Sequence, residues 1–401
     1  MEQKVAMFGC WGDNFVRGSI GTAMDDVLKT IVNDKQDHII IAGDNYYAEK
    51  RRGMDEKVTK IIHIDAIDEI IKKLPDVHID IITGNHEMDE TDSKKIQYES
   101  STPFQATTNC EIVKLELSSI DAVNKVRSNQ INVRIKKMGG LSENTNSIQP
   151  PVSMIGNDCY LFIDSSMYEY SPKEMGCYTH VYGEWDLNQA EMIRELLQTV
   201  PITETSRIFF VAHHPLLVFR YKPASFGIKP KEESAPTNIN HRLISFLHQV
   251  VMENSLNNHK LHYLCADFHL YQHQRVIIGG AFEIDVHIVG TGGADPDDYF
   301  DPTKHSIKLL QKSEPNATFT VDGELSLDTT EDQHMDKLGN ISVMANCLTS
   351  IKQFGYLQIT DVLEFKPVEN RLAASNGGRK TKRKRKYNRK SLRPLILKKR
   401  R

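Results

Sequence analysis

The sequence predicts an α/β fold in which parallel strands alternate with helices and end in polar side chains. Residues 39–42 form an apolar run that leads, through a glycine, into Asp44. A second run, residues 79–82, is apolar except for Asp80 and leads into Asn85 and His86 after a connection long enough for a helix. Such runs are typical of central strands buried on both faces. Their alternation with helices indicates βαβ units with right-handed crossovers.

The first half of the chain predicts its elements in a regular order. Residues 4–9 form an apolar run typical of a first strand, and residues 20–32 have the periodicity of an amphipathic helix. After the strand that precedes Asp44, residues 55–73 carry apolar side chains every three or four positions, and Pro75 closes this predicted helix. The strand at 79–82 completes the second βαβ unit.

The second half resumes this rhythm after an interruption. From about residue 100 to 157 the pattern becomes polar and weakly periodic, which predicts an insertion between core elements. The elements predicted after it are a strand at 159–164, a helix at 187–197, and strands at 208–212, 261–266, 284–289 and 354–362. His213 follows the strand at 208–212, and Asp267 and His269 follow the strand at 261–266. We therefore predict one domain over residues 1–370.

The remaining residues, 371–401, have a different composition. The chain has 401 residues and a formal charge of −3, yet residues 376–401 hold 14 Lys and Arg and no acidic residue. The rest of the chain therefore carries a formal charge of about −17. This composition predicts a disordered basic tail. A nuclear-localisation signal, a contact to nucleic acid or another polyanion, and a solvated arm folded back on the acidic domain are its alternative interpretations.

Cysteine usage and hydropathy predict the compartment. The six cysteines show no spacing typical of a zinc module or a disulfide framework. The first residues lack the charged, apolar and small-residue pattern of a signal peptide, and no apolar stretch approaches the roughly 20 residues that span a bilayer. We therefore expect a reduced intracellular protein, cytoplasmic or nuclear, without a membrane contact.

Polar residues at the predicted strand ends form the chemically informative set. Gly-Asp or Gly-Asn after a single strand is most often only a turn. An ordered series of thiol, carboxylate, phenol, amide and imidazole groups at adjacent strand ends instead favours a site for two cations bridged by one carboxylate. The members of this series are Cys10, Asp44, Tyr47, Asn85, His86, His213, Asp267 and His269.

These residues lie in motifs that resemble a known superfamily. The motifs are Gly9-Cys10-Trp11-Gly12, Gly43-Asp44-Asn45-Tyr46-Tyr47, Gly84-Asn85-His86-Glu87, Val211-Ala212-His213-His214-Pro215 and Ala266-Asp267-Phe268-His269-Leu270-Tyr271-Gln272. In this order they resemble the calcineurin-like metallophosphoesterases and, among these, the purple acid phosphatases. The resemblance covers residues 4 to about 300, apart from the insertion.

The resemblance implies both a fold and a reaction. The fold would be a sandwich of two mixed β-sheets flanked by helices, and the reaction would be hydrolysis of a phosphomonoester by a metal-bound hydroxide. Asp44 would bridge two metal ions. The same resemblance assigns Tyr47 and His269 to the first metal, Asn85 and His213 to the second, and His86 to the substrate as general acid or phosphate ligand.

Two residues depart from the superfamily pattern. Cys10 stands where the family has an aspartate ligand of the first metal, and Asp267 stands where it has a histidine ligand of the second. A thiolate suits zinc or iron better than magnesium or manganese, whereas the Asp267 carboxylate favours harder ions. We expect two divalent or trivalent ions, drawn from iron, zinc and manganese.

Three functions are compatible with these motifs. The first is a phosphoesterase acting on a phosphorylated substrate, most simply a phosphomonoester. The second is a degenerate metallophosphoesterase that has lost turnover through the changes at Cys10 and Asp267 and serves as a binding or scaffold protein. The third is a nucleic-acid phosphodiesterase, which the basic tail favours and the motif ending in Tyr47 does not.

Overall fold

The computed structural model describes the parts of the chain on which the predicted core depends. It describes residues 3–11, 22–44, 77–82, 84, 131–133, 152–165, 168, 189–219, 233–234, 236–237, 240–293, 306–307, 316–321 and 341–368. All of them belong to a unit that extends from Met1 to Glu369. The predicted helix at 55–73 and the tail at 371–401 lie outside the described residues, and the domain boundaries stay predictions.

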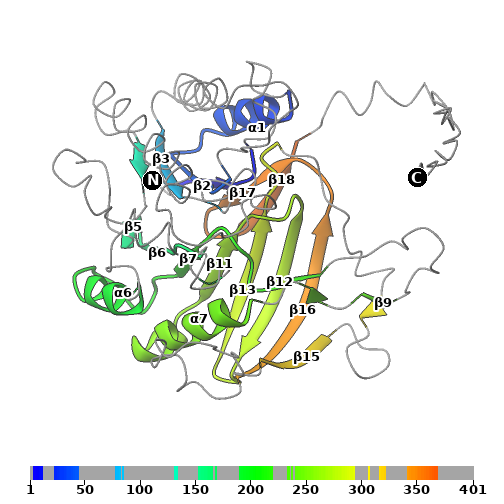
Figure 1. Ribbon diagram of the computed structural model, residues 1–401. Coiled ribbons are helices and arrows are strands. Elements are labelled where there is room, and N and C mark those ends of the chain that lie inside the picture. The colour runs from blue at the N-terminus through cyan, green and yellow to red at the C-terminus, as the bar shows by residue number, and fades with distance from the viewer. Residues whose placement is uncertain are drawn as a thin grey trace, which may run out of the picture. The chain divides into compact units, whose positions relative to one another are not determined.

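Two mixed sheets form the core of the described unit (Figure 1). In the smaller sheet, parallel strands from the first part of the sequence lie beside an antiparallel pair from the C-terminal part of the domain. Its described strands, in spatial order, are β18 (Leu363–Pro367), β17 (Gly355–Ile359), β1 (Val5–Phe8), β2 (His38–Ala42), β3 (His78–Ile82) and β4 (Ile131–Val133). β1, β2, β3 and β4 are parallel, and β17 pairs antiparallel with β1.

The larger sheet combines a parallel centre with antiparallel flanks. Its described strands, in spatial order, are β15 (Asn316–Val321), β16 (Ile341–Ile351), β12 (Tyr271–Ile278), β13 (Phe282–Val289), β11 (Leu261–Cys265), β7 (Ile208–Val211), β6 (Asp158–Phe162) and β5 (Val152–Ile155). β13, β11, β7 and β6 are parallel. Short pairs lie elsewhere: β8 (Val218–Phe219) with β10 (Pro236–Thr237), and β9 (Glu233–Ser234) with β14 (Ser306–Ile307).

An apolar layer joins the two sheets face to face. Met7 and Ile40 of the smaller sheet belong to the same buried cluster as Phe209, Leu264 and Val289 of the larger sheet. Side chains alternate along a strand, so neighbouring residues such as Phe210 point to the opposite face. There they pack with α6 (Gln189–Leu197) and α7 (His241–Glu253), which cover the larger sheet. The predicted class of two mixed sheets flanked by helices is confirmed.

The helices follow from local sequence signals. α1 (Thr22–Asn33) lies beside the smaller sheet (Figure 1) and buries Met24, Val27 and Ile31 at helical spacing. α7 begins at Asn240, whose side-chain oxygen accepts the backbone N–H of Leu243 at 3.0 Å and so caps the helix. A short 3₁₀ helix (Leu256–Asn258) follows α7. None of the described helices combines the length and apolar character required to cross a membrane.

The predicted insertion at about 100–157 contains two described strands. β4 pairs with β3 at the end of the smaller sheet, and β5 pairs antiparallel with β6 at the end of the larger one. The structure therefore places parts of this region, which has weak hydrophobic periodicity, at the edges of both sheets. Edge strands are half exposed and need less apolar sequence than central strands.

Candidate metal centre

The ends of five parallel strands meet where the two sheets adjoin. β1, β2 and β3 contribute the smaller-sheet side, while β7 and β11 contribute the larger-sheet side. Backbone hydrogen bonds connect the loops that follow them: Cys10 N donates to Gly43 O at 3.2 Å, and Ala266 N donates to His213 O at 2.9 Å. Gly9 N also donates to Val289 O at 3.0 Å, from one sheet to the other. This is the edge at which open α/β sheets place their ligands.

Glycines permit the close approach of these loops. A Cβ atom added at Gly84 would overlap Asp44 and lie 2.9 Å from Cε1 of His213. A Cβ at Gly43, whose φ is +80°, would lie 2.6 Å from Nδ1 of the same His213. The Gly-Asp and Gly-Asn dipeptides therefore do more than form turns, because they leave room for an imidazole between two strand ends.

Three polar residues at this edge have left-handed backbone conformations. Their φ angles are +55° at Cys10, +52° at Asp44 and +60° at Asp267. Such a conformation costs a residue with a side chain roughly 1–2 kcal/mol, and strained backbones concentrate at functional sites. In each case the sharp turn follows directly after a buried strand and brings the side chain to the meeting point of the loops.

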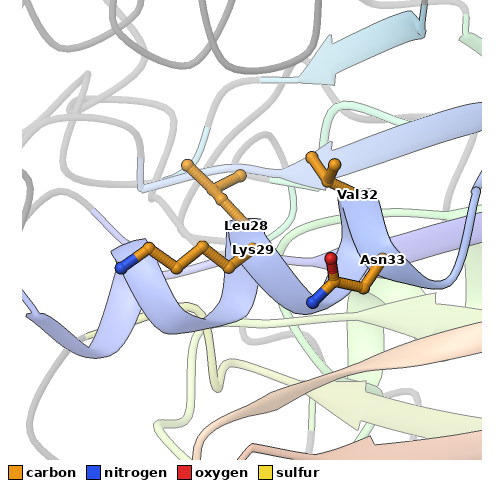
Figure 2. A pocket seen from close by; sticks show the side chains of 4 residues that line it. All are labelled: Leu28, Lys29, Val32 and Asn33. Carbon is orange, nitrogen blue, oxygen red and sulfur yellow. The ribbon is translucent and has the colours of Figure 1, made fainter.

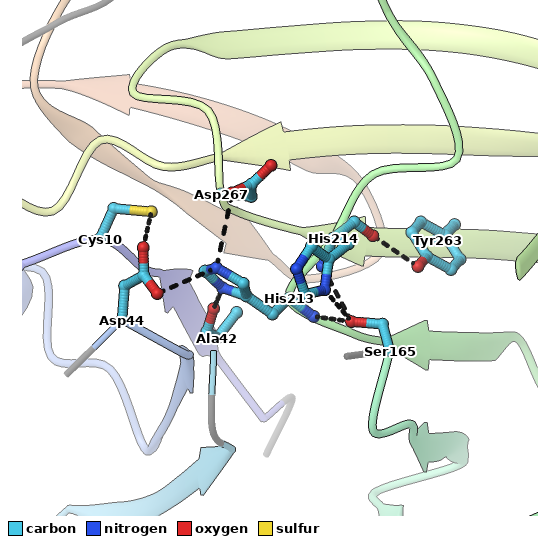
Figure 3. Close-up of polar contacts among 8 residues, drawn as sticks. All are labelled: Cys10, Ala42, Asp44, Ser165, His213, His214, Tyr263 and Asp267. Carbon is cyan, nitrogen blue, oxygen red and sulfur yellow. Dashed lines mark hydrogen bonds and ion pairs between the residues drawn. The ribbon is translucent and has the colours of Figure 1, made fainter. Parts of the chain in front are cut away.

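Asp44 lies between a thiol and an imidazole (Figure 3). One carboxylate oxygen, Oδ1, is 3.1 Å from Nε2 of His213, and the other, Oδ2, accepts a long contact of 3.7 Å from Sγ of Cys10. The side chain is 1% exposed. Its two oxygens thus face different groups, which is the arrangement that a bridging carboxylate needs.

The orientation of His213 follows from a hydrogen bond to the backbone. Its Nδ1 lies 2.7 Å from the carbonyl oxygen of Ala42, which can only accept, so Nδ1 carries the proton. Nε2 then presents its lone pair towards Asp44 Oδ1 and, at 3.8 Å, Asp267 Oδ1. A lone pair facing two carboxylates requires a positive charge between them, supplied by a proton or a metal ion.

The charge balance of His213 supports the same conclusion. Burial by itself lowers the pKa of this imidazole, but the carboxylates of Asp44 and Asp267 raise its pKa to about 10. The buried His213 imidazole therefore keeps a second proton when no other cation is present. Metal ions and protons compete for such ligand sets.

Two groups of donor atoms lie at this edge, each with its members within 4.8 Å of one another. One consists of Cys10, Asp44 and His269, and the other of His213, His214 and Asp267. Sulfur, nitrogen and carboxylate oxygen together suit zinc or iron, whereas all-oxygen sets suit magnesium. The donor chemistry therefore fits transition-metal ions, and the contact between Asp44 and His213 joins the two groups.

The structure brings together five of the residues predicted from the sequence, namely Cys10, Asp44, His213, Asp267 and His269. Tyr47, Asn85 and His86 lie outside the described residues. Gly84, which is described and precedes Asn85 in the sequence, lies against Asp44 and His213. The ligand and acid roles of all eight residues stay predictions.

Sequence reasoning missed Ser165, which lies just after β6. Its hydroxyl accepts the backbone N–H groups of His213 at 3.1 Å and His214 at 2.9 Å. His214 is also held from its other side, since Tyr263 Oη donates to its carbonyl oxygen at 2.7 Å. The same rule that identified the other residues, a polar side chain directly after a buried strand, also applies to Ser165.

A pocket elsewhere on the smaller-sheet side is separate from this chemistry (Figure 2). It is lined by Leu28, Lys29, Val32 and Asn33 of α1. None of these side chains belongs to either donor group. The pocket therefore does not contribute to either donor group.

Comparisons with known proteins return distant structural similarities. No protein-family model and no curated protein matches the chain. Among solved structures it is similar to a purple acid phosphatase from yellow lupin (Lupinus luteus) seeds, with 14% identity, a TM-score of 0.45 and coverage of 92% of this chain and 52% of that chain. The chain thus spans about half the length of the lupin protein.

Two further solved structures are similar at the same level. GAP50, the anchor in the inner membrane complex of Plasmodium, shares 12% identity at a TM-score of 0.45, with 92% of this chain and 85% of that chain covered. A dimetal phosphatase from Danio rerio shares 13% identity at a TM-score of 0.34, with 71% and 86% covered. Similarities of this size do not assign an activity, so the function is argued from the donor groups.

Proposed function

We propose that the chain is a metal-dependent phosphoesterase that hydrolyses phosphomonoesters at a centre for two metal ions. The observation that carries this proposal is the position of Asp44, with one carboxylate oxygen facing Cys10 and the other facing His213. A shared carboxylate between two donor groups is what a two-metal phosphoesterase requires. The buried, glycine-lined junction of five strand ends supplies the rigid support for such a centre.

The residues that would hold the ions come from both sheets. We assign Cys10, Asp44 and His269 to one ion, together with Tyr47, and His213 and Asp267 to the other, together with Asn85 and the shared carboxylate of Asp44. When bound, the ions would neutralise charge on a phosphate and lower the pKa of a water molecule. Iron, zinc and manganese are the ions we consider, and the thiol of Cys10 favours the first two.

The protein's own groups would orient the ligands and move the proton. The Ala42 carbonyl keeps the proton of His213 on Nδ1, so that Nε2 stays available as a ligand. We assign His86 to protonation of the leaving alkoxide or to binding of the phosphate, a role that typically contributes about 10² to 10⁴ in rate.

The decisive experiment measures metal content and activity in the same sample. Purified protein is supplied with iron, zinc or manganese, its metal stoichiometry is determined by elemental analysis, and hydrolysis of a chromogenic phosphomonoester is followed. We expect up to two ions per chain and turnover that disappears with a chelator. Protein that holds less than one ion per chain and leaves the ester intact would rule out the enzyme.

A second candidate function is a non-catalytic binding protein. Two sequence features favour it: Cys10 and Asp267 replace family ligands, and residues 376–401 carry 14 basic side chains without an acid. Such a protein would use the tail to bind nucleic acid or another polyanion, and this affinity would fall steeply with salt. Metal loading without turnover, combined with salt-sensitive DNA binding that is lost when 376–401 are removed, would favour this candidate.

A nucleic-acid phosphodiesterase would combine metal-dependent hydrolysis with binding of nucleic acid by the tail. Its substrate distinguishes it from the phosphomonoesterase and from the binding protein. It would cleave a phosphodiester while leaving the monoester unchanged, and deletion of the tail would raise KM more than it lowers kcat. The phosphomonoesterase would show neither effect. Both outcomes can be read from one comparison of the full chain with a chain ending at residue 370.

A further inference from the structure

Ser165 holds the turn that carries the two histidines of the candidate centre. It follows β6, the strand beside β7, and is 1% exposed. Its Oγ accepts the backbone N–H of His213 at 3.1 Å and that of His214 at 2.9 Å, and it lies 2.9 Å from Nδ1 of His214 (Figure 3). The Ser165 hydroxyl thus contacts the backbone N–H groups of both histidines and the imidazole ring of His214.

The hydrogen-bonding capacity of a hydroxyl fixes the direction of each contact. A serine hydroxyl has two acceptor lone pairs and one hydrogen. The two backbone N–H groups use the lone pairs, so the hydrogen is donated to Nδ1 of His214. Nε2 of His214 then carries that ring's proton, whereas in His213 it is Nδ1 that donates to the backbone, to the carbonyl of Ala42.

These contacts limit the movement of His213 relative to Asp44. Ser165 fixes the His213 main chain from β6, and the Ala42 carbonyl fixes its ring from β2. Because both the main chain and the ring of His213 are held, its Nε2 stays 3.1 Å from Oδ1 of Asp44. Loss of the hydroxyl would leave two buried N–H groups without this acceptor and allow the turn to shift.

The geometry points to Ser165 as a positioning residue for the candidate metal centre, acting through the His213-His214 turn rather than by touching substrate or metal. This inference rests on the proposed function, since it assumes that His213 is a metal ligand. Groups that orient metal ligands from behind typically change metal affinity by 10–100-fold when they are removed. The same fold-change is expected here for the ion bound by His213.

The first test compares zinc affinity in three variants. Ser165→Ala should weaken the site that includes His213 by 10–100-fold in a competition titration against a chelating dye, whereas Ser165→Thr, which keeps the hydroxyl, should restore affinity. Ser206→Ala is the matched control, because Ser206 is also buried and accepts a backbone N–H, that of Thr203 at 3.1 Å, but precedes β7 at its opposite end. It should leave zinc affinity unchanged.

The second test needs no metal. In protein labelled at histidine nitrogen, the Nδ1–H of His213 should give a slowly exchanging imidazole signal, because it is buried and bound to Ala42. Ser165→Ala should shift this signal or speed its exchange, while Ser165→Thr and Ser206→Ala should keep it. If Ser165→Ala does not fold, Tyr263→Phe loosens the same turn at the His214 carbonyl and should alter the same signal.

The outcomes separate this inference from the proposed function. Wild-type protein that binds no metal contradicts the proposed function, and the imidazole signal still decides the role of Ser165. Wild-type protein that binds zinc while Ser165→Ala binds it equally well and keeps the signal overturns the positioning role alone. A loss that the threonine variant does not restore would also overturn it, because the hydroxyl would then not be the cause.

Discussion

The carboxylate of Asp44 is a negative charge placed almost completely out of water. Burying an ionised carboxylate costs several kcal/mol unless a partner compensates it. Its near neighbours among the described residues include the Cys10 thiol and the His213 imidazole. An imidazolium compensates the charge in the metal-free state, and metal ions would compensate it in the loaded state. Both states need the carboxylate itself, so this residue is where substitution should have the largest effect.

Asp44→Asn should abolish metal binding and activity together. The amide keeps the size of the side chain but removes its negative charge. It also replaces one carboxylate oxygen, which could bind a metal, by an NH₂ group that can only donate hydrogen bonds. We expect metal content to fall below one ion per chain and turnover to be lost with it, since removal of a ligand shared by two ions affects both. Asp158→Asn, which weakens a partly buried ion pair with Arg207 outside both donor groups, serves as the control and should keep metal and activity. An active, loaded Asp44→Asn protein would contradict the bridging role.

Cys10 should determine which ion the first donor group prefers, if it binds metal as proposed. Its side chain is fully buried beside Asp44, and its φ of +55° is more easily adopted by an aspartate. Cobalt-loaded wild-type protein should show a near-ultraviolet sulfur-to-metal band that Cys10→Ser lacks. Cys10→Asp should shift metal preference from zinc towards manganese. An identical spectrum in the wild-type and serine proteins would remove Cys10 from the ligand list.

At the scale of elements, the centre depends on how closely the loops after β2, β3 and β7 approach. Gly84→Ala places a methyl group against Asp44 and His213, which should destabilise the fold by about 1–3 kcal/mol and reduce metal affinity. Gly280→Ala is the matched control: its φ is +65° but nothing lies within 4 Å, so it should cost only about 1 kcal/mol and leave metal binding intact. Chemical denaturation and zinc titration of both variants check this difference.

The same elements show what the sequence could and could not predict. β2, β3, β7 and β11 are short apolar runs buried on both faces and followed by polar residues, so their positions and their ligand-bearing ends were predictable. Which strands share a sheet was not, because β1 pairs with β17 across most of the chain and no local pattern encodes that contact. α7 and β12, although well formed, were not predicted.

Side-chain roles were less accessible than strand ends. The hydrogen bonds of His213 to Ala42 and of Ser165 to the His213-His214 turn join residues that are 171 and 48 positions apart, respectively. Residue types at strand ends identify donors, but only the packed sheets determine which nitrogen of an imidazole is protonated. The sequence therefore predicted the members of the centre better than their orientation.

Across the whole molecule, the larger sheet also buries imidazoles that belong to neither donor group. His262 of β11 stacks on Phe209 at 4.7 Å, and His287 of β13 stacks on His273 of β12 at 4.3 Å. His262 is 2% exposed, and within the described part of the chain neither of its ring nitrogens has a hydrogen-bond partner. Burial lowers its pKa to about 3, and burial together with the neighbouring histidines lowers the pKa of His287 well below its usual value.

These histidines should make the fold sensitive to acid. Because the folded-state pKa of His262 lies below the unfolded value of about 6.5, the folded state binds fewer protons, and its stability is fully present above pH 6.5 and falls as pH drops towards 3. At pH 5.5 the loss from His262 alone should be about 1.4 kcal/mol. Denaturant titrations at pH 7.5, 6.5 and 5.5 measure it.

His262→Phe isolates this contribution, because a phenyl ring can stack on Phe209 and does not titrate. The charged groups nearest His262 are Asp285, which raises the pKa of His262, and Lys260, Arg207 and His273, which lower it; all remain in the variant. We expect the stability difference between pH 7.5 and 5.5 to shrink by about 1.4 kcal/mol. An unchanged difference would place the acid sensitivity elsewhere. If the contribution is confirmed, the protein unfolds more readily in acid, and its folded state should persist longest near neutral pH.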